Sequence, residues 1–500
     1  MALKQAESGK TSGTAYQKKQ PGFQARILTI LAAIIVCFAI MYLPIPESLR
    51  TVRGSLLDPK GQKALGILAF ALILWIFEAL PFHVTGLLSI LALSLVGAGD
   101  FQAIIRKGFG DDVVVFFIGV LALAAAIVRS GLGKRISLLV LSITGNSTRR
   151  IIFGFLAAGA VLSMWVTAMA ASAIIMPLAL GILKEEGSIP GKSQFGRGLM
   201  IAVAWGALIG AVGTPAGSGS NPLVVKFLGN LAHLEISFTS WMALGIPMLL
   251  LLLPAGWALI LLFFPPEMKH LKKTNEEIKM EFSEQSPMSR DEKATLVVFS
   301  LTIAVWLFSP LIQEIAHIKI PISMAALGAL VLLFAPGVTS FRWKEIEKEI
   351  DWSGIILIAT GISLGMTLYE SGAAGWLSAL ILGGIGSVPL FFQFALIALG
   401  VLAVKIAFSS NTLTGTIIVP LVLALSTQLG PEATALAFAA GFTANLAVIL
   451  VTTSPVNIIP YTTGYFTIAD MAKAGLAFTP VIALVIALVF STVGRLMGIV

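Results

Sequence analysis

The chain has 500 residues, of which 57% are hydrophobic and only 12% are charged, and its mean hydropathy is +0.95. Since a soluble globular domain carries about 25% charged residues, this composition excludes a soluble protein and predicts an all-α polytopic membrane protein. The net charge of +8, the single cysteine and four scattered histidines come with no metal-ligand spacing and no catalytic motif, so we predict neither an enzyme, an organic cofactor nor nucleic-acid binding.

The N-terminal part of the chain contains a basic tail and several apolar segments. Because Lys and Arg gather on the cytoplasmic side of membranes, we expect residues 1–26 to be cytoplasmic and the protein to lie in the plasma (inner) membrane. The first membrane spans are predicted at 27–43, 64–79 and 84–95. A helix at 113–128 follows Asp111 and Asp112, whose charges suit the positive end of a helix, and a short helix follows at 136–143.

Two apolar segments are interrupted in a way that predicts re-entrant hairpins. Residues 151–183 hold Thr167 and Pro177, and this segment is too long for one straight span and too short for two. Residues 388–425 are interrupted by Ser410-Asn411-Thr412. The membrane interior offers no water to loose polar groups, so such interruptions survive where they line a cavity or a binding site.

Two further helices are predicted to be broken near their middle. Residues 198–229 break at 213–222, and residues 434–468 break at 452–457, in both cases where Pro and Asn residues gather. The unwound carbonyls and hydroxyls of such breaks suit a hard cation such as sodium.

The second half repeats the element order of the first. After a span at 241–264, a soluble cytoplasmic loop at 265–293 separates the halves. The remaining elements are spans at 294–311, 320–334, 352–368 and 474–496, a membrane-surface segment at 341–351 and a short helix at 376–382. We therefore predict about 11 transmembrane helices plus two re-entrant hairpins in an inverted two-fold repeat, a pattern typical of secondary transporters.

The tip of the second hairpin is the strongest candidate for an anion site. Ser410, Asn411 and Thr412 offer hydroxyl and amide donors at a helix start, where carboxylates bind well. Lys405 lies in the apolar segment just before this tip. A cation within a span is functional by default, and its ammonium would replace a bound sodium. The alternative is a lysine that extends toward the membrane surface, and the sequence leaves both interpretations open.

An ordered set of motifs over residues 60–490 points to one family. The motifs are Glu78-Ala79-Leu80-Pro81, Phe116-Phe117-Ile118-Gly119, Ser130-Gly131-Leu132-Gly133-Lys134-Arg135, Gly213-Thr214-Pro215, Ser410-Asn411-Thr412 and Pro455-Val456-Asn457. In this order they resemble the divalent anion:sodium symporter (DASS) family of dicarboxylate, citrate and sulfate carriers.

The resemblance implies an elevator-type carrier that assembles as a homodimer, with a scaffold domain and a moving transport domain. The scaffold would comprise 27–150 and 294–385, and the transport domain 151–264 and 386–500. The substrate site would be formed by Ser410, Asn411, Thr412, Thr167, Pro215 and Pro455. The sodium sites would be formed by Ser409, Asn411, Thr453, Gly213 and Thr167.

The first hairpin departs from the family pattern. Counting back from Pro177 places Thr167-Ala168-Met169 where the first Ser-Asn-Thr is expected. Ala168 and Met169 offer no side-chain donor, so this half of the site has lost an amide and a hydroxyl. The hypothesis that follows is a carrier that needs fewer sodium ions, or none, with Lys405 supplying positive charge.

The predicted function is secondary active transport of a small anion, first of all a di- or tricarboxylate, by sodium symport or anion exchange. A carrier of sulfate or another inorganic oxyanion is a second candidate. A non-transporting, receptor-like degenerate carrier is a third. A cation/proton antiporter is disfavoured, because residues 198–229 and 434–465 contain no carboxylate.

Overall fold

The computed structural model describes residues 22–500 except 273–285, 426–428 and 431. Most of the predicted tail at 1–26 and the middle of the loop at 265–293 therefore lie outside the described residues. The described part is mostly helical and contains one small hairpin, in which β1 pairs with β2 in antiparallel register. Eight of its helices are long and apolar enough to cross a membrane, and six shorter apolar helices lie among them.

The first half contains, in chain order, α1 (Phe23–Tyr42), α2 (Glu47–Arg50), β1 (Thr51–Val52), β2 (Ser55–Leu56), α3 (Pro59–Ile76), α4 (Phe82–Leu95), α5 (Phe101–Phe109), α6 (Asp112–Ser130), α7 (Leu132–Ser142), α8 (Thr148–Ser163), α9 (Ala168–Glu185), α10 (Gln194–Gly210), η1 (Pro215–Gly217), α11 (Asn221–Ala232) and α12 (Phe238–Phe263).

The second half contains α14 (Arg290–Ala316), α15 (Ile322–Leu333), α16 (Trp343–Ile346), η2 (Glu347–Glu349), α17 (Trp352–Glu370), α18 (Ala373–Leu382), η3 (Ile385–Ser387), α19 (Leu390–Lys405), α20 (Asn411–Leu423), α22 (Glu432–Thr443), η4 (Val451–Thr453), α23 (Pro455–Tyr461), α24 (Ile468–Val489) and the π-helical turn η5 (Phe490–Gly494).

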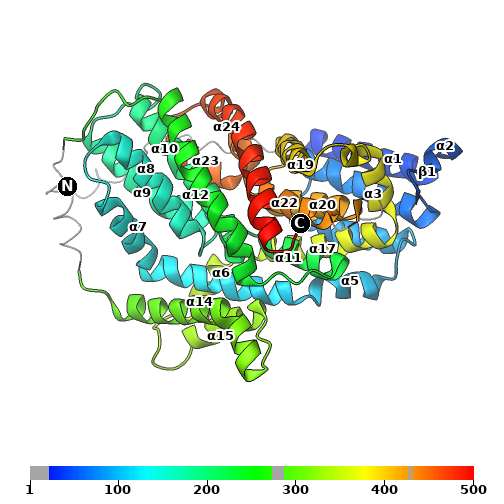
Figure 1. The fold of residues 1–500 in the computed structure, drawn as a ribbon, viewed down its shortest axis with the longest axis horizontal. Coiled ribbons are helices and arrows are strands. Elements are labelled where there is room, and N and C mark those ends of the chain that lie inside the picture. The colour runs from blue at the N-terminus through cyan, green and yellow to red at the C-terminus, as the bar shows by residue number, and fades with distance from the viewer. Residues whose placement is uncertain (1–21, 273–285, 426–428, 431) are drawn as a thin grey trace, which may run out of the picture.

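The helices form two groups that meet in the middle of the molecule. In Figure 1, α8, α9, α10 and α12 lie together toward one end, α1 and α3 lie at the other, and α14 and α15 lie along one edge. The helix pairs α8 with α10, α12 with α24 and α20 with α22 pack against one another. In addition, α17 packs against α4 and α5, and α6 packs against α15.

The contact between α17 and α20 joins these two groups closely. A Cβ placed on Gly361 of α17 would lie 2.7 Å from the hydroxyl oxygen of Thr416 in α20, and one on Gly365 would lie 2.8 Å from the ring of Phe227 in α11. Larger side chains at Gly361 and Gly365 would therefore push α17 away from both helices.

Two sequence-based boundaries need correction. The helix breaks run over 211–220 and 444–454, so the second one starts about two helical turns before the predicted 452–457. The short amphipathic helix α5 was not predicted; at nine residues, with Arg106 and Lys107 in its last turn, it is too short and too polar to be a membrane span.

A carboxylate outside the membrane spans caps α10. Glu267 accepts hydrogen bonds from the Ser193 hydroxyl and from the backbone N–H of Phe195, the latter at 2.7 Å. Burial alone would raise the pKa of Glu267, but these hydrogen bonds outweigh it and hold the pKa below its ordinary value of 4.5. A carboxylate whose pKa is lower in the folded than in the unfolded state contributes stability at pH values above its unfolded-state pKa. This stability is lost as the pH falls through the folded-state pKa.

We therefore expect Glu267→Gln to lower the midpoint of thermal unfolding at pH 7. The difference between the unfolding midpoints of the variant and the parent protein should become smaller as the pH falls below about 4.5. Thermal unfolding in detergent at pH 7 and at pH 4 measures both values. Glu314→Gln, at an exposed position of α14, is the control, and an equal gap at both pH values would contradict this account.

Candidate functional site

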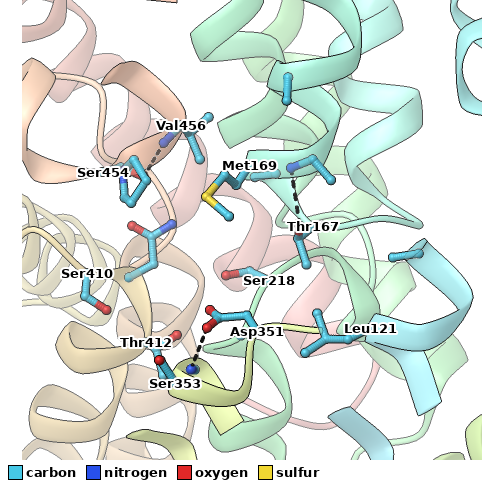
Figure 2. A pocket seen from close by; sticks show the side chains of 18 of the residues that line it. Leu121, Thr167, Met169, Ser218, Asp351, Ser353, Ser410, Thr412, Ser454 and Val456 are labelled. Atoms are coloured by element: carbon cyan, nitrogen blue, oxygen red, sulfur yellow. Dashed lines mark hydrogen bonds between the residues drawn. The ribbon is translucent and has the colours of Figure 1, made fainter. Parts of the chain in front are cut away.

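A cavity of about 1160 Å³ lies where the two hairpins, the two broken helices and several other segments meet. It is lined by Ser409, Ser410, Asn411 and Thr412 from one hairpin and by Thr167, Ala168 and Met169 from the other. The breaks contribute Gly217, Ser218, Gly219, Ser454, Pro455 and Val456. Figure 2 shows side chains from all of these segments pointing toward a common space.

The second hairpin consists of α19 and α20, with its tip at 406–410. Ser410 caps α20, because its side-chain oxygen accepts a hydrogen bond from the N–H of Leu413 at 3.3 Å. The first-turn N–H groups of Asn411 and Thr412 have no acceptor within the helix. The positive end of α20 therefore faces the cavity, as an anion site requires.

The first hairpin consists of α8 and α9 and is capped in the same way. Thr167 accepts a hydrogen bond from the N–H of Ala170 at 3.3 Å, and a proline follows ten positions after each cap, at Pro177 and Pro420. Thr167 is thus the counterpart of Ser410. Met169 is 45% exposed and lines the cavity, so an apolar side chain stands where the other hairpin has Thr412.

The two helix breaks share one geometry, which an asparagine holds in place. Asn221 donates its amide to the carbonyls of Ala211 and Thr214, both at 2.8 Å. Asn457 donates its amide to the carbonyls of Ala447 and Leu450, at 2.7 and 3.1 Å. In both breaks the acceptors lie ten and seven residues before the asparagine, so each asparagine satisfies carbonyls that unwinding leaves without a helical partner.

A buried polar network connects the breaks to the second hairpin. Ser220 donates to the side-chain oxygen of Asn445 at 2.6 Å, and the amide of Asn445 donates to the side-chain oxygen of Asn221 at 2.7 Å. The carbonyl of Asn445 in turn accepts from the Asn411 amide at 3.4 Å. Sequence reasoning missed Asn445 and Ser220.

Three of the predicted site residues lie behind the cavity rather than on its wall. Pro215 is buried in η1, and Gly213 packs against Met164 of the first hairpin tip. The Thr453 hydroxyl donates to the carbonyl of Leu450 at 2.7 Å, so it closes the break locally. None of Gly213, Pro215 and Thr453 lines the cavity, whereas Thr167, Pro455 and the second hairpin tip do.

Lys405 lies at the last turn of α19 and is only 2% exposed. Its ammonium is buried and has no hydrogen-bond partner in the described part of the chain, and the same holds for the side-chain oxygens of Asn411 and Asn457. Lys405 does not line the cavity. Since its ammonium does not reach the surface, the interpretation of Lys405 as a residue that extends to the membrane surface does not fit this structure.

The rest of the cavity wall carries charges that sequence reasoning did not assign to a site. His83 and Lys134 line it together with the acidic residues Glu349 and Asp351. Asp351 caps α17 by accepting from the N–H of Gly354 at 2.9 Å, and Figure 2 shows its carboxylate beside the cavity. Only the folded chain brings these four residues to the hairpin tips.

Comparison with known proteins identifies the family of this chain. Residues 24–500 match the family model described as the sodium:sulfate symporter transmembrane region. An uncharacterized transporter of Haemophilus influenzae is 30% identical over 440 residues, which cover 86% of this chain and 91% of the relative. The sodium-dependent dicarboxylate transporter SdcS of Staphylococcus aureus is 29% identical over 449 residues, with 86% and 85% covered.

Among solved structures, the Alcanivorax borkumensis YdaH transporter has a similar fold, with a TM-score of 0.50, 15% identity and coverage of 95% of this chain and 97% of that chain. The family match over nearly the whole chain agrees with the resemblance that the ordered motifs gave. The chain is therefore an integral membrane transporter, not an enzyme, and belongs to the sodium:sulfate symporter family, the divalent anion:sodium symporters.

Proposed function

We propose that the protein is a secondary active transporter of a small dicarboxylate, located in the plasma membrane with its N-terminus in the cytoplasm. The observation that carries the proposal is the convergence of two helix starts, those of α9 and α20, on one cavity that Ser410, Asn411 and Thr412 line with donors. Helix starts and hydroxyl or amide donors bind carboxylates. The similarity to SdcS supports a dicarboxylate substrate.

The proposed mechanism is alternating access by an elevator movement within a homodimer. The transport domain would comprise 151–264 and 386–500, and the scaffold 27–150 and 294–385, with about 11 membrane spans in all. The matched caps of the hairpins and the matched asparagines of the breaks support an inverted two-fold repeat. The glycines of α17 at the boundary would allow α20 and α11 to lie close to the scaffold.

The two hairpins differ in the side-chain oxygens that they could offer as ligands to a sodium ion. At the second hairpin, the buried side-chain oxygen of Asn411 has no partner in the described residues, and oxygen is the ligand that hard cations prefer. At the first hairpin, Ala168 and Met169 have no side-chain oxygen, and only Thr167 offers one. A sodium ion therefore fits beside Asn411 and Ser409, and fits poorly at the first hairpin.

Uptake into proteoliposomes tests transport and coupling together. We expect labelled succinate to enter vesicles that contain unlabelled succinate. We also expect the uptake to keep a substantial part of its rate when choline replaces sodium, because one of the two sodium sites is incomplete. Strict sodium dependence with a stoichiometry above two would contradict the proposed coupling, and absence of counterflow would reject transport and favour a receptor-like protein.

Lys405 is proposed to supply positive charge to this half of the transport domain. We expect Lys405→Met, which keeps the length of the side chain and removes its charge, to lower succinate uptake by about tenfold or more. Lys473→Met, at an exposed lysine of α24, is the matched control. Uptake by Lys405→Met at the parent rate would show that the charge has no part in transport.

Sulfate remains the second candidate substrate, because helix starts bind sulfate and carboxylate by the same interactions. The apolar Met169 favours it, since this wall offers no donor for a second carboxylate. Competition of labelled succinate uptake by unlabelled sulfate or unlabelled succinate separates the two: the dicarboxylate proposal predicts strong inhibition by succinate and weak inhibition by sulfate.

A further inference from the structure

The tip of the second hairpin is hydrogen-bonded to a carboxylate from the other half of the molecule. The Ser409 hydroxyl donates to a side-chain oxygen of Glu78 at 2.8 Å, and the two residues lie 331 positions apart in the chain. Both are half-buried. Ser409 lines the cavity next to Ser410 and Asn411, so Glu78 reaches the edge of the proposed substrate site.

Glu78 is held in place by the turn that joins α3 to α4. The N–H of Glu78 donates to the carbonyl of Trp75 at 3.3 Å, and the N–H of Ala79 donates to the carbonyl of Leu74 at 3.1 Å. Glu78 adopts a left-handed backbone with φ of 49° directly after the C-terminal end of α3, the conformation with which helices commonly end. The turn therefore fixes this carboxylate to the group of helices that contains α3 and α4.

A second carboxylate would compete with Glu78 for the same donor. A serine hydroxyl has one hydrogen to donate, and Ser409 gives it to Glu78. A substrate carboxylate at the hairpin tip would need such donors, and its negative charge would repel the nearby Glu78 carboxylate. Binding of the anion is thus expected to weaken the contact between Ser409 and Glu78.

A second contact of this kind is too remote from the cavity to sense the substrate. Lys226 of α11 pairs with Asp111 at 3.0 Å and with Asp112 at 3.1 Å at the start of α6. None of these three residues lines the cavity. The contact between Ser409 and Glu78, in contrast, lies at the cavity, where a bound anion would meet it directly.

We propose that Glu78 acts as an internal carboxylate that ties the empty second hairpin to the scaffold, and that the substrate displaces it. The inference rests on the proposed transport function. In this proposal Glu78 is a positioning residue for the transport step. Because its contact with Ser409 holds the empty transport domain, the domain moves more readily when substrate is bound. The carrier would therefore exchange anions faster than it releases them without exchange.

The ratio of the exchange rate to the net efflux rate measures how much more readily the loaded transport domain moves than the empty one. Proteoliposomes loaded with labelled succinate are diluted into buffer with or without unlabelled succinate, and the two efflux rates are compared. Glu78→Ala and Ser409→Ala should each lower the ratio by about tenfold, because the empty carrier then returns freely. The double variant should lower the ratio no further than the single variants do, since each substitution removes the same hydrogen bond between Ser409 and Glu78.

Two control variants test whether the change in the ratio depends on the contact between Ser409 and Glu78. Ser409→Thr retains the hydroxyl and should retain the parent ratio. Glu370→Gln removes the negative charge that pairs with Lys107 and joins α17 to α5 away from the hairpins, and it should also leave the ratio unchanged. Additive effects of Glu78→Ala and Ser409→Ala, or a parent-like ratio in both variants, would overturn the inference. Absence of any succinate exchange in the parent protein would instead reject the proposed function.

Discussion

Asn411→Ala is expected to raise the succinate concentration for half-maximal uptake by about 10- to 100-fold, since a hydrogen bond to a charged group contributes about 1.5–3 kcal/mol. The side-chain oxygen of Asn411 has no partner in the described residues, and its amide makes only one long contact, 3.4 Å to the carbonyl of Asn445. Its side chain is therefore placed for ligands in the cavity rather than for the fold.

The same reasoning predicts that Asn411→Ala folds normally. Its midpoint of thermal unfolding in detergent should lie close to that of the parent protein, while added succinate should no longer raise it, because a ligand stabilises only a protein that binds it. Asn230→Ala, at an exposed position on α11, is the control for both measurements. Parent-like uptake by Asn411→Ala would show that the site lies elsewhere.

Asn457→Ala is expected to act on stability. Its amide satisfies two buried carbonyls of the second break, and each carbonyl left without a partner costs about 1–3 kcal/mol. Asn221→Ala should be more damaging, because it also removes the nearest of the acceptors of the Asn445 amide. We therefore expect both variants to unfold at lower temperature than the parent protein, with Asn221→Ala the lower of the two.

Thermal unfolding of the purified variants in detergent measures this order. Asn230→Ala again serves as the control, because it makes the same substitution at an exposed site. If the unfolding midpoint of Asn457→Ala equalled that of the control, the hydrogen bonds from the amide to the carbonyls of the break would not contribute to the stability of the protein.

The parts of the site that depend on local chain geometry could be predicted from the sequence. The correspondence of Thr167 with Ser410 was predicted from its spacing to Pro177, which equals the spacing of Ser410 to Pro420. The structure adds that both residues cap their helices. The interruption at 409–412 also predicted a hairpin tip, because polar residues inside a membrane require partners or a cavity.

The breaks themselves were placed less well, because proline marks a break without showing where unwinding starts. The unwound segment extends back from each asparagine to carbonyls ten residues earlier. This reach depends on the amide side chain rather than on the proline, so a pattern of prolines placed the second break too late.

The contacts between distant segments could not be predicted from a single sequence. Asn445 is one polar residue in an apolar stretch, and nothing in its spacing indicates Asn221 and Ser220 as partners. Likewise Glu78 and Ser409 meet only because the hairpin tip lies against the turn between α3 and α4. Such contacts depend on how the helices pack, which periodicity does not encode.

Substrate protection of two thiols tests most directly whether both hairpins share one binding site. In a Cys37→Ala background, Met169→Cys on the first hairpin and Thr412→Cys on the second place a thiol on either side of the cavity. Succinate should slow the reaction of both thiols with a maleimide, with the same concentration for half-protection. Protection of only one thiol, or of neither under conditions where succinate is transported, would contradict a shared site.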